Sequence, residues 1–493
     1  MGSNGIAYRS ATELVSDLTS GAVSATEVME QTLRLVDERE PSLNAIVYRG
    51  FDEALESARA ADDAIASGEP GGSLRGVPVV MKDLFCFKPG WPATFGGIPA
   101  MADFSIDGYC IWAQRMEEAG AIIIGKGNSP ALGFRGATDN YLFGATRNPF
   151  DTTRNPGGSS GGSAAVVADG LVPIAEGTDG GGSIRIPAAW CGLVGYQPSA
   201  GRVPSILRPN AFSGVSPFIY EGPITRTVED AALAMSALGG PHPADPFCLL
   251  DTVDYMSALG QGIAGKTIAY SPDLGVYPVA PDVAEVVAEA VRAFEDAGAV
   301  VEQVEIDIDL DQRELADLWC RLIMPLSLDS FAQLADGGLD LIEEHRSDLP
   351  QEFWRWADHV AGMTAMEYFD DNSRRTLVWD ALQSVLTRYD LLVSPTVASL
   401  PTLNRDDGNT AGPTEVNGVE VDPLIGWCMT YFTNFTGHPA ISLPAGLSEG
   451  LPVGMQVIGR RWADVDVLAA ASVFEEIRPW DHFYDIPKAR SLT

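Results

Sequence analysis

Apolar residues recur at helical spacing along the first part of the chain. Residues 10–20 and 24–39 are predicted to be two amphipathic helices, and residues 51–65 a third, because apolar side chains return every three or four positions on one face. Ser24 and Glu27 have the spacing of a capping box, in which each side chain satisfies a free backbone N–H at the start of a helix. Helices therefore open the chain.

Beyond these helices, apolar runs of strand length alternate with helical segments. A buried strand is predicted over residues 77–82, followed by a helix over 109–119 and a strand over 121–125. Further downstream the same alternation predicts strands at 266–270, 299–308 and 389–394, and a helix at 281–297. This alternation is typical of an α/β fold, in which helices cover a sheet.

Residues 312–388 interrupt the alternation. This stretch is mostly helical in pattern and rich in large apolar side chains. The whole chain is longer than a usual single domain, yet no long low-complexity linker divides it. We therefore predict N-terminal helices at 1–75 that pack on the core, an α/β core formed by 76–311 and 389–493, and a helical substrate-shaping region at 312–388.

Two glycine-dense loops each carry a serine. Ser159 lies in residues 155–163 and Ser183 in residues 178–187, so the two serines are 183 − 159 = 24 positions apart. Glycine–serine runs are also typical of flexible linkers. Residues 164–168 are apolar, however, and are predicted to form a short buried helix, which does not suit a solvated linker. The two loops are the predicted frame of an active site.

The second loop has the composition of an oxyanion hole. Glycine tolerates positive φ, and it lets backbone N–H groups converge on a point that a side chain would block. A well-placed N–H donor stabilises a tetrahedral intermediate by about 3–4 kcal/mol. The backbone N–H groups of Gly180, Gly181, Gly182 and Ser183 are the candidate donors.

These loops resemble the signature of the amidase signature family. The matching strings are GGSSGGSAAVVA from Gly157 and GTDGGGSIRIPAAWCGLVGYQPSAGRVP from Gly177. Further matches are RGVPVVMKDL from Arg75, AGAIIIGK from Ala119, GATRNP from Gly144, GHPAISLP from Gly437 and GMQVIG from Gly454. The resemblance extends from about residue 10 to about residue 475. It implies a large mixed, twisted β-sheet layered between helices, a helical cap, and hydrolysis of C–N bonds by a Ser/cis-Ser/Lys triad.

By position, the resemblance makes Ser183 the nucleophile, Ser159 the bridging serine and Lys82 the base. An ammonium group cannot accept a proton, so the pKa of Lys82 must lie several units below about 10.4, and burial can lower a lysine pKa that far. The apolar residues that precede Lys82 favour burial. The chain has five lysines, and Lys126, which also ends an apolar strand, is the competing candidate.

The bridging hydroxyl must receive a proton from Ser183 and pass one to Lys82. The family places a cis peptide bond before this serine, which here would be Gly158–Ser159. The adjacent Ser160 is an alternative bridge, and Ser159 is preferred because its 24-residue offset matches the family spacing.

The resemblance also gives roles to the neighbours of Ser183. Asp179 and Arg185 would form an ion pair that braces the oxyanion loop, and Thr178 would form a hydrogen bond within the site. Gly180 departs from the threonine that many relatives carry, which loosens the loop and removes a hydroxyl. Gln197 stands where a lysine is common, a smaller departure.

Three residues are candidates for the substrate pocket. Cys320 resembles a substrate-adjacent position in nylon-oligomer-cleaving relatives, and Trp427 and Phe432 belong to an aromatic segment predicted to line the same cleft. Ordinary helix core is the competing interpretation of Cys320 and of the other large apolar residues in 312–388. The large apolar side chains of 312–366 and 427–435 predict a bulky aryl or aliphatic substrate. Amides such as anilides and oligoamides, as well as carbamates (urethanes), suit the same chemistry, and ester hydrolysis can accompany it.

Other functions share parts of this sequence pattern. Gly157 to Gly161 also fits the G-x-S-x-G elbow of α/β-hydrolases, with Ser159 as nucleophile and His438 as the histidine in the most distinctive neighbourhood. The catalytic subunit of a tRNA-dependent amidotransferase carries the same signature, but residues 371–379 replace its usual tyrosine-rich segment. A binding protein on an inactive scaffold is a further alternative, which the three filled triad positions disfavour.

Charge and composition exclude some classes of binding partner. Lys+Arg 32 against Asp+Glu 67 gives a formal net charge of −35, which repels nucleic acids and anionic membranes. No apolar run reaches the roughly 18–20 residues of a membrane span and no apolar signal core opens the chain, so we expect a cytoplasmic protein, either a monomer or a homo-oligomer. No metal or cofactor is implied. The six cysteines are scattered without a CxxC pair, which predicts neither a zinc site nor a disulfide framework: Cys86, Cys110, Cys191, Cys248, Cys320 and Cys428.

Overall fold

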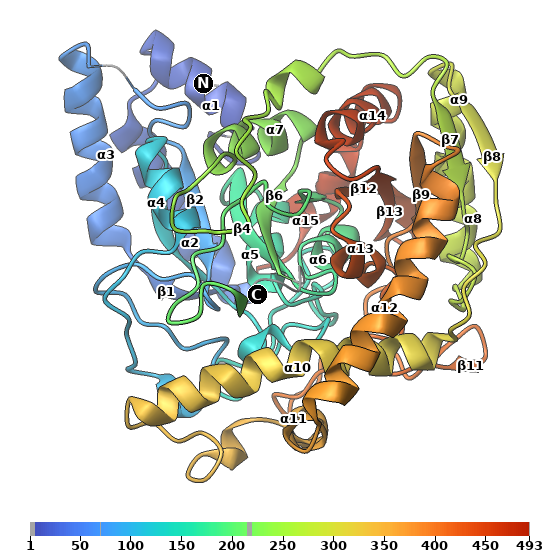
Figure 1. Cartoon of the computed structure of the whole chain (residues 1–493). Coiled ribbons are helices and arrows are strands. Elements are labelled where there is room, and N and C mark those ends of the chain that lie inside the picture. The colour runs from blue at the N-terminus through green and yellow to red at the C-terminus, as the bar shows by residue number, and fades with distance from the viewer. Residues whose placement is uncertain (1–4, 70, 214–218, 493) are drawn as a thin grey trace.

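A mixed sheet of 11 strands forms the centre of the protein in a computed structural model that describes residues 5–69, 71–213 and 219–492 (Figure 1). In spatial order its strands are β1 (Ile46–Arg49), β3 (Ile122–Gly127), β2 (Pro78–Lys82), β4 (Ile174–Asp179), β6 (Tyr220–Thr225), β5 (Val194–Gln197), β12 (Ala440–Ser448), β13 (Leu451–Gly459), β9 (Leu391–Pro395), β7 (Thr267–Tyr270) and β8 (Val300–Gln303). The ladders of β2 with β3 and β4, and of β7 with β8 and β9, are parallel, and the remaining ladders are antiparallel. The predicted mixed α/β sheet is confirmed.

Helices cover both faces of this sheet, which twists visibly across Figure 1. The α-helices of the described residues are α1 (Ala11–Ser20), α2 (Ala25–Arg39), α3 (Phe51–Ala66), α4 (Ile111–Glu118), α5 (Gly161–Ala168), α6 (Arg185–Trp190), α7 (Val228–Leu238), α8 (Pro281–Ala290), α9 (Arg292–Asp296), α10 (Gln312–Asp336), α11 (Gln351–Ala361), α12 (Ala365–Leu386), α13 (Tyr431–Thr436), α14 (Asp464–Ile477) and α15 (Asp485–Ala489). The three predicted N-terminal helices are present as α1, α2 and α3. The capping box of Ser24 and Glu27 is confirmed, since the Glu27 N–H donates to the Ser24 side chain and the Ser24 N–H to Glu27.

Three elements in the second half differ from the prediction. The helix predicted over 281–297 is divided into α8 and α9 at Val291. The strand predicted over 299–308 is only the four residues of β8, because its partner β7 offers four residues to pair with. Two short strands that were not predicted, β10 (Glu415–Val416) and β11 (Val419–Glu420), pair with each other.

The helical region 312–388 contains α10 and α11, at the lower edge of Figure 1, and α12, which runs upward from there on the right. Its apolar side chains share a core cluster with Phe134, with α6 and with the segment around Trp427, while a second cluster extends across the whole sheet and its other helices. The three helices therefore pack beside α6, which follows the loop that carries Ser183. Their assignment as a substrate-shaping region stays a prediction.

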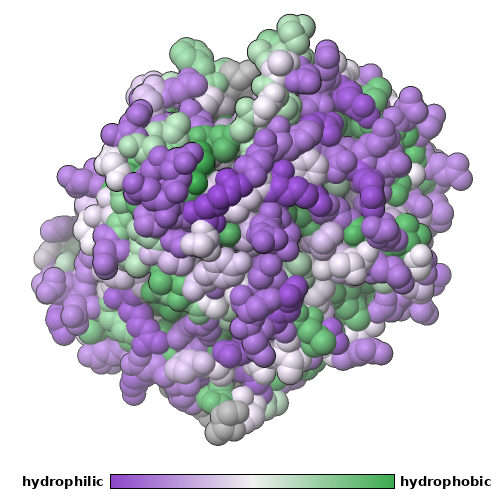
Figure 2. Space-filling model, turned by 90° about the horizontal axis from the view of Figure 1, so that it is seen from below, coloured by the Kyte–Doolittle hydropathy of each residue, from purple (hydrophilic) through white to green (hydrophobic). Residues whose placement is uncertain are grey.

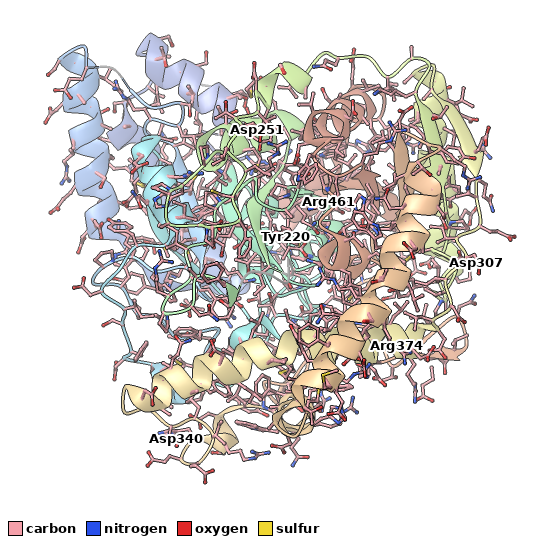
Figure 3. The ribbon with its side chains drawn as sticks, in the orientation of Figure 1. Tyr220, Asp251, Asp307, Asp340, Arg374 and Arg461 are labelled. Atoms are coloured by element: carbon pink, nitrogen blue, oxygen red, sulfur yellow. A yellow bond between two sulfur atoms is a disulfide. The ribbon has the colours of Figure 1, made fainter. Side chains whose placement is uncertain are left out.

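The surface is dominated by polar residues. The face that carries α10 and α11 is mostly hydrophilic, with apolar residues scattered over it (Figure 2). Three acidic residues lie far apart in Figure 3: Asp307 at the right edge, Asp340 at the lower left and Asp251 in the upper middle of the view. Among the described residues, no helix is long and apolar enough to cross a lipid bilayer.

One cysteine pair corrects the sequence analysis. Cys86 and Cys110 form a disulfide, with 5.3 Å between their Cα atoms. They lie 24 residues apart, and the fold brings them together because the Cys110 N–H donates to the Phe87 carbonyl. No local cysteine spacing signals such a pair. Cys191, Cys248, Cys320 and Cys428 are free thiols.

Candidate active site

The lysine and the first serine meet at the ends of neighbouring strands. Lys82 is the last residue of β2 and is fully buried, and its Nζ lies 2.7 Å from Ser159 Oγ and 2.8 Å from Thr178 Oγ1. Ser159 precedes α5, and the Gly158–Ser159 peptide bond is cis. The structure thus brings Lys82, Ser159 and Thr178 together.

Burial changes the acid–base properties of this lysine. It lowers the pKa of Lys82 to about 7, against the opposing pull of the nearby Glu176 and Asp179 carboxylates. A substantial fraction of Lys82 is therefore neutral near neutral pH, as a proton acceptor must be.

The competing lysine is engaged elsewhere. Lys126 Nζ lies 2.9 Å from the Asp83 carboxylate and donates to the Pro92 carbonyl at 2.7 Å. Both ionic partners are buried, which makes this a structural ion pair. Lys126 Nζ thus contacts Asp83 and Pro92, whereas Lys82 Nζ contacts Ser159.

The alternative bridging serine also has other partners. Ser160 Oγ accepts the Thr178 backbone N–H at 3.3 Å, and the Ser160 N–H donates to the Ser183 carbonyl at 3.2 Å. Ser160 therefore joins the two glycine loops to each other.

Ser183 shares one cavity with Ser159. The cavity wall includes both serines together with Thr178, Gly180 and Gly181. Ser183 is almost buried, with 8% of its surface exposed. The two glycine-rich loops thus line the same cavity.

Side chains from distant segments fix the carbonyls of the oxyanion loop. The Trp319 indole N–H donates to the Gly180 carbonyl at 2.9 Å, and the Thr430 hydroxyl donates to the Gly181 carbonyl. The Ile186 N–H donates to the Gly182 carbonyl at 2.6 Å. Because C=O and the following N–H point in opposite directions in a trans peptide, these contacts also aim the N–H groups of the loop.

The prediction that the Gly182 N–H is an oxyanion donor is corrected by this arrangement. The N–H of Gly182 donates to Asp179 Oδ1 at 2.6 Å, so it is occupied rather than open to an oxyanion. Among the hydrogen bonds of the described residues, the N–H groups of Gly180, Gly181 and Ser183 have no acceptor. Three of the four predicted donors therefore remain available. Gly182 has a φ of +122°, and a Cβ there would lie 2.0 Å from Thr430 Oγ1, so this position requires glycine.

Asp179 and Arg185 form the predicted ion pair. Both are fully buried, with contacts of 3.0 and 3.1 Å between the guanidinium and the carboxylate. Although burial opposes it, the Arg185 charge holds the pKa of Asp179 below its ordinary value. The Asn434 side chain also donates to Asp179 at 2.9 Å, and its own backbone carbonyl accepts from Tyr220, which lies near the middle of the view in Figure 3. The pair braces the loop that carries Ser183.

The predicted pocket residues do not line the cavity. Cys320, Trp427 and Phe432 are each fully buried, and Trp427 stacks on Trp190 at 4.6 Å between ring centroids. α10 contributes Trp319, Ile323 and Ser327, which are four residues apart, and also Met324 to the cavity wall. Cys320 is one position on from Trp319, which turns it about 100° away around the helix. Cys320 in α10 and Phe432 in α13 are core side chains of helices, whereas Trp427 lies in a buried turn, and a role of the three at the substrate stays a prediction.

Part of the cavity wall lies within the predicted substrate-shaping region 312–388, and its other apolar residues were not predicted. The wall is mostly apolar: Leu84, Phe85, Leu132, Phe134, Ile186, Ile219, Trp319, Ile323, Met324 and Ile425. The four-residue spacing of apolar positions from Trp319 was the one signal for the α10 contribution. Phe85 and Phe134 lie in irregular segments, where no periodicity points to a shared cavity.

The elbow alternative finds no support in the position of its histidine. His438 is fully buried, with Nδ1 2.7 Å from Thr436 Oγ1 and Nε2 2.9 Å from Gln383 Nε2. Burial lowers its pKa to about 3. Its partners are thus Thr436 and Gln383 rather than a serine of the glycine loops.

Comparison with known proteins agrees with this architecture. A bacterial aryl acylamidase of the amidase signature family has a crystal structure that matches with a TM-score of 0.97, at 49% identity and with 99% of each chain covered. The structure of a 6-aminohexanoate cyclic dimer hydrolase complexed with substrate matches with a TM-score of 0.84, at 27% identity, covering 96% of this chain and 97% of that chain.

Two relatives match at the sequence level. The acylamidase of Rhodococcus erythropolis is 35% identical over 476 residues, with 96% of both chains covered. A glutamyl-tRNA(Gln) amidotransferase subunit from Moorella thermoacetica is 35% identical over 490 residues, covering 95% of this chain and 96% of the relative. The Amidase family model matches residues 27–468. The chain therefore belongs to the amidase signature family of hydrolases that act on amide C–N bonds.

Proposed function

We propose that this amidase cleaves the C–N bond of aryl acylamides through an acyl-enzyme on Ser183. The contact of 2.7 Å between Lys82 Nζ and Ser159 Oγ carries the proposal, because it couples a buried amine to a serine that shares a cavity with Ser183. An amine of lowered pKa, a bridging hydroxyl and a second serine are the parts of a proton relay.

In the proposed mechanism, neutral Lys82 takes a proton from Ser159 while Ser159 takes one from Ser183. The Ser183 oxygen attacks the amide carbonyl, and N–H groups of Gly180, Gly181 and Ser183 are placed to stabilise the oxyanion. The proton returns along the relay to the leaving nitrogen, so the C–N bond breaks as the amine departs. Water, activated through the same relay, then cleaves the Ser183 ester and releases the acid.

The cavity wall favours an aromatic substrate. Phe85, Phe134 and Trp319 present rings to a cavity whose other side chains are mostly aliphatic. An aryl acylamidase with 49% identity supports the same class. Oligoamides, carbamates or urethanes and esters present a similar carbonyl to the nucleophile, and we propose them as secondary substrates.

The amidotransferase role is the second candidate, because the amidotransferase relative from Moorella thermoacetica shares 35% identity with this chain. Such a protein acts with partner chains. Purification of the native protein as a stable heteromer, with no hydrolysis by the isolated chain, would favour this role over the amidase proposal.

A substrate panel tests the proposed function. The purified chain is incubated with acetanilide, hexanamide, a phenyl carbamate and a phenyl ester, and amine or phenol release is measured. We expect the highest kcat/KM among the nitrogen compounds for the anilide. Absence of amine release from every amide would contradict the proposal.

The pH profile should show an acid limb near neutrality. The base works only when it is neutral, and the pKa of Lys82 is about 7, so kcat/KM should fall as the pH drops through about 7 and level off above it. Initial rates with an anilide between about pH 5 and pH 9 measure the limb. An activity plateau that extends unchanged down to about pH 5 would be inconsistent with Lys82 as base.

Trp319→Phe tests the support of the oxyanion loop. The variant loses the indole N–H that holds the Gly180 carbonyl, and we expect kcat for the anilide to fall by about 10-fold through misplaced donors. Trp354→Phe is the matched control, since that indole donates to the Arg346 carbonyl and Trp354 does not line the cavity. Equal activities of the two variants would refute the role of Trp319.

The proposal also covers the cellular location and the oligomeric state of the enzyme. We propose a cytoplasmic enzyme, a monomer or homo-oligomer, that binds no nucleic acid, because its strongly negative charge repels nucleic acids and anionic membranes.

A further inference from the structure

A buried carboxyl group contacts the backbone of Lys82. Glu176 lies on β4 and is fully buried, and its Oε2 accepts the Lys82 backbone N–H at 2.7 Å. Thr178 lies two residues further along β4, on the same face of the strand, and contacts Lys82 Nζ. Glu176 and Thr178 thus hold the two ends of one lysine residue.

The hydrogen bond alone does not require a charge. The β2–β4 ladder pairs Val79 with Ile174 and Val80 with Ala175, and it extends no further. The Glu176 side chain takes the Lys82 N–H in place of a strand carbonyl, and any neutral acceptor could do the same. Its other oxygen, Oε1, is buried with no hydrogen-bond partner among the described residues. Burying an oxygen without a hydrogen-bond partner costs folding free energy, which indicates that the Glu176 charge has a function.

Glu176 and Lys82 act on each other electrostatically. Burial lowers the pKa of Lys82 and raises that of Glu176 to about 7, while the opposite charges of the two groups counteract both shifts. Such a pair titrates together rather than as two independent groups.

Other charged groups near Glu176 and Lys82 lie on several of the neighbouring helices and strands. Lys126 on β3 also lowers the pKa of Glu176, but its charge is balanced by Asp83. α5 packs on the same strands and contributes no charged residue. Burial and the Glu176 charge raise the pKa of Glu221 on β6 to about 8. The remaining charged groups are Asp179 on β4, which pairs with Arg185 from α6, Arg115 on α4, and Glu229 and Asp230 on α7.

We propose that Glu176 is a positioning residue that fixes the Lys82 backbone and, through its negative charge, sets the pH at which Lys82 becomes a competent base. This inference rests on the proposed function of Lys82. The Glu176 carboxylate stabilises the ammonium form of the lysine. Removing that charge therefore lets Lys82 lose its proton at lower pH, and the enzyme keeps its activity further into the acid range.

Glu176→Gln separates the charge from the hydrogen bond. The glutamine carbonyl oxygen can still accept the Lys82 N–H, while the charge is gone. We expect the acid limb of kcat/KM for an anilide to move down by roughly one pH unit. The rate at which a fluorophosphonate labels Ser183, followed by intact mass against pH, should show the same shift without depending on the choice of substrate.

A matched control is available on α14. Glu475 accepts the Val228 backbone N–H through Oε2 at 2.9 Å, and burial raises its pKa to about 7. It is not among the groups that act on Lys82. Glu475→Gln should therefore leave the acid limb unchanged. Glu176→Met, a second neutral variant of similar length, should share the shift of Glu176→Gln even though it lacks the acceptor.

The outcomes distinguish the role of Glu176 from the proposed function. Wild-type enzyme whose Ser183 is not labelled would overturn the proposed function, and the role of Glu176 with it. Labelled Ser183 with an unchanged acid limb in folded Glu176→Gln or Glu176→Met would overturn the role of Glu176 alone. It would also be overturned if both neutral variants failed to fold while Glu475→Gln folded, because the carboxylate would then serve stability.

Discussion

Ser183→Ala is expected to lower kcat/KM for anilide hydrolysis by about 10⁴- to 10⁶-fold. The variant removes the atom that attacks the carbonyl and leaves the rest of the cavity in place, including Ser159, Lys82 and the oxyanion loop. Residual rate would come only from substrate binding and oxyanion stabilisation. Initial rates of amine release, measured at high enzyme concentration, give the loss.

Ser163→Ala is the matched control for this variant. Ser163 lies in the same signature, on α5, and its buried hydroxyl has no hydrogen-bond partner among the described residues. Its removal should change kcat/KM by less than about twofold. Substantial turnover by Ser183→Ala would contradict the assignment of the nucleophile, and a large loss in Ser163→Ala would show that the segment responds to any change.

Lys82→Met is expected to lower kcat/KM by about 10³- to 10⁴-fold, the usual contribution of a general base and somewhat less than that of the nucleophile. Methionine fills a similar volume and cannot accept a proton from Ser159. The contacts of Lys82 Nζ with Ser159 and Thr178 are lost at the same time. A pH–rate profile of the variant should lack the acid limb near pH 7.

Lys82→Arg distinguishes proton acceptance from charge. Arginine keeps a cation at this position but stays protonated at every accessible pH, so it should be as inactive as Lys82→Met. An arginine variant with wild-type activity would mean that the site needs a positive charge rather than a base. Thermal unfolding of both variants controls for stability.

Much of the site could be predicted because its residues lie in short continuous motifs that resemble those of the amidase signature family. Lys82, Ser159 and Ser183 each stand at the end of an apolar run or in a glycine-rich loop, and the fold brings Lys82 to Ser159 as expected. The α/β alternation likewise follows from local periodicity. The ion pair of Asp179 with Arg185, which the resemblance implied, is also present.

The features that sequence reasoning missed depend on contacts between distant segments. Gly182 seemed a donor for the oxyanion, but the Thr430 hydroxyl fixes the preceding peptide and directs the Gly182 N–H to Asp179. Trp319 lines the cavity while its neighbour Cys320 is turned into the core, and only the rotation of α10 against the sheet decides between them. Local patterns do not fix such rotations.

The nucleophile is tested best by identifying the serine that becomes covalently modified. Wild-type enzyme is treated with a fluorophosphonate, its intact mass is measured, and the modified peptide is mapped, with Ser183→Ala treated in parallel. The proposed mechanism predicts a single adduct on Ser183, and no adduct in the variant. An adduct on Ser159 would contradict it and favour the elbow mechanism, and an active enzyme that carries no adduct on any serine would exclude a serine nucleophile.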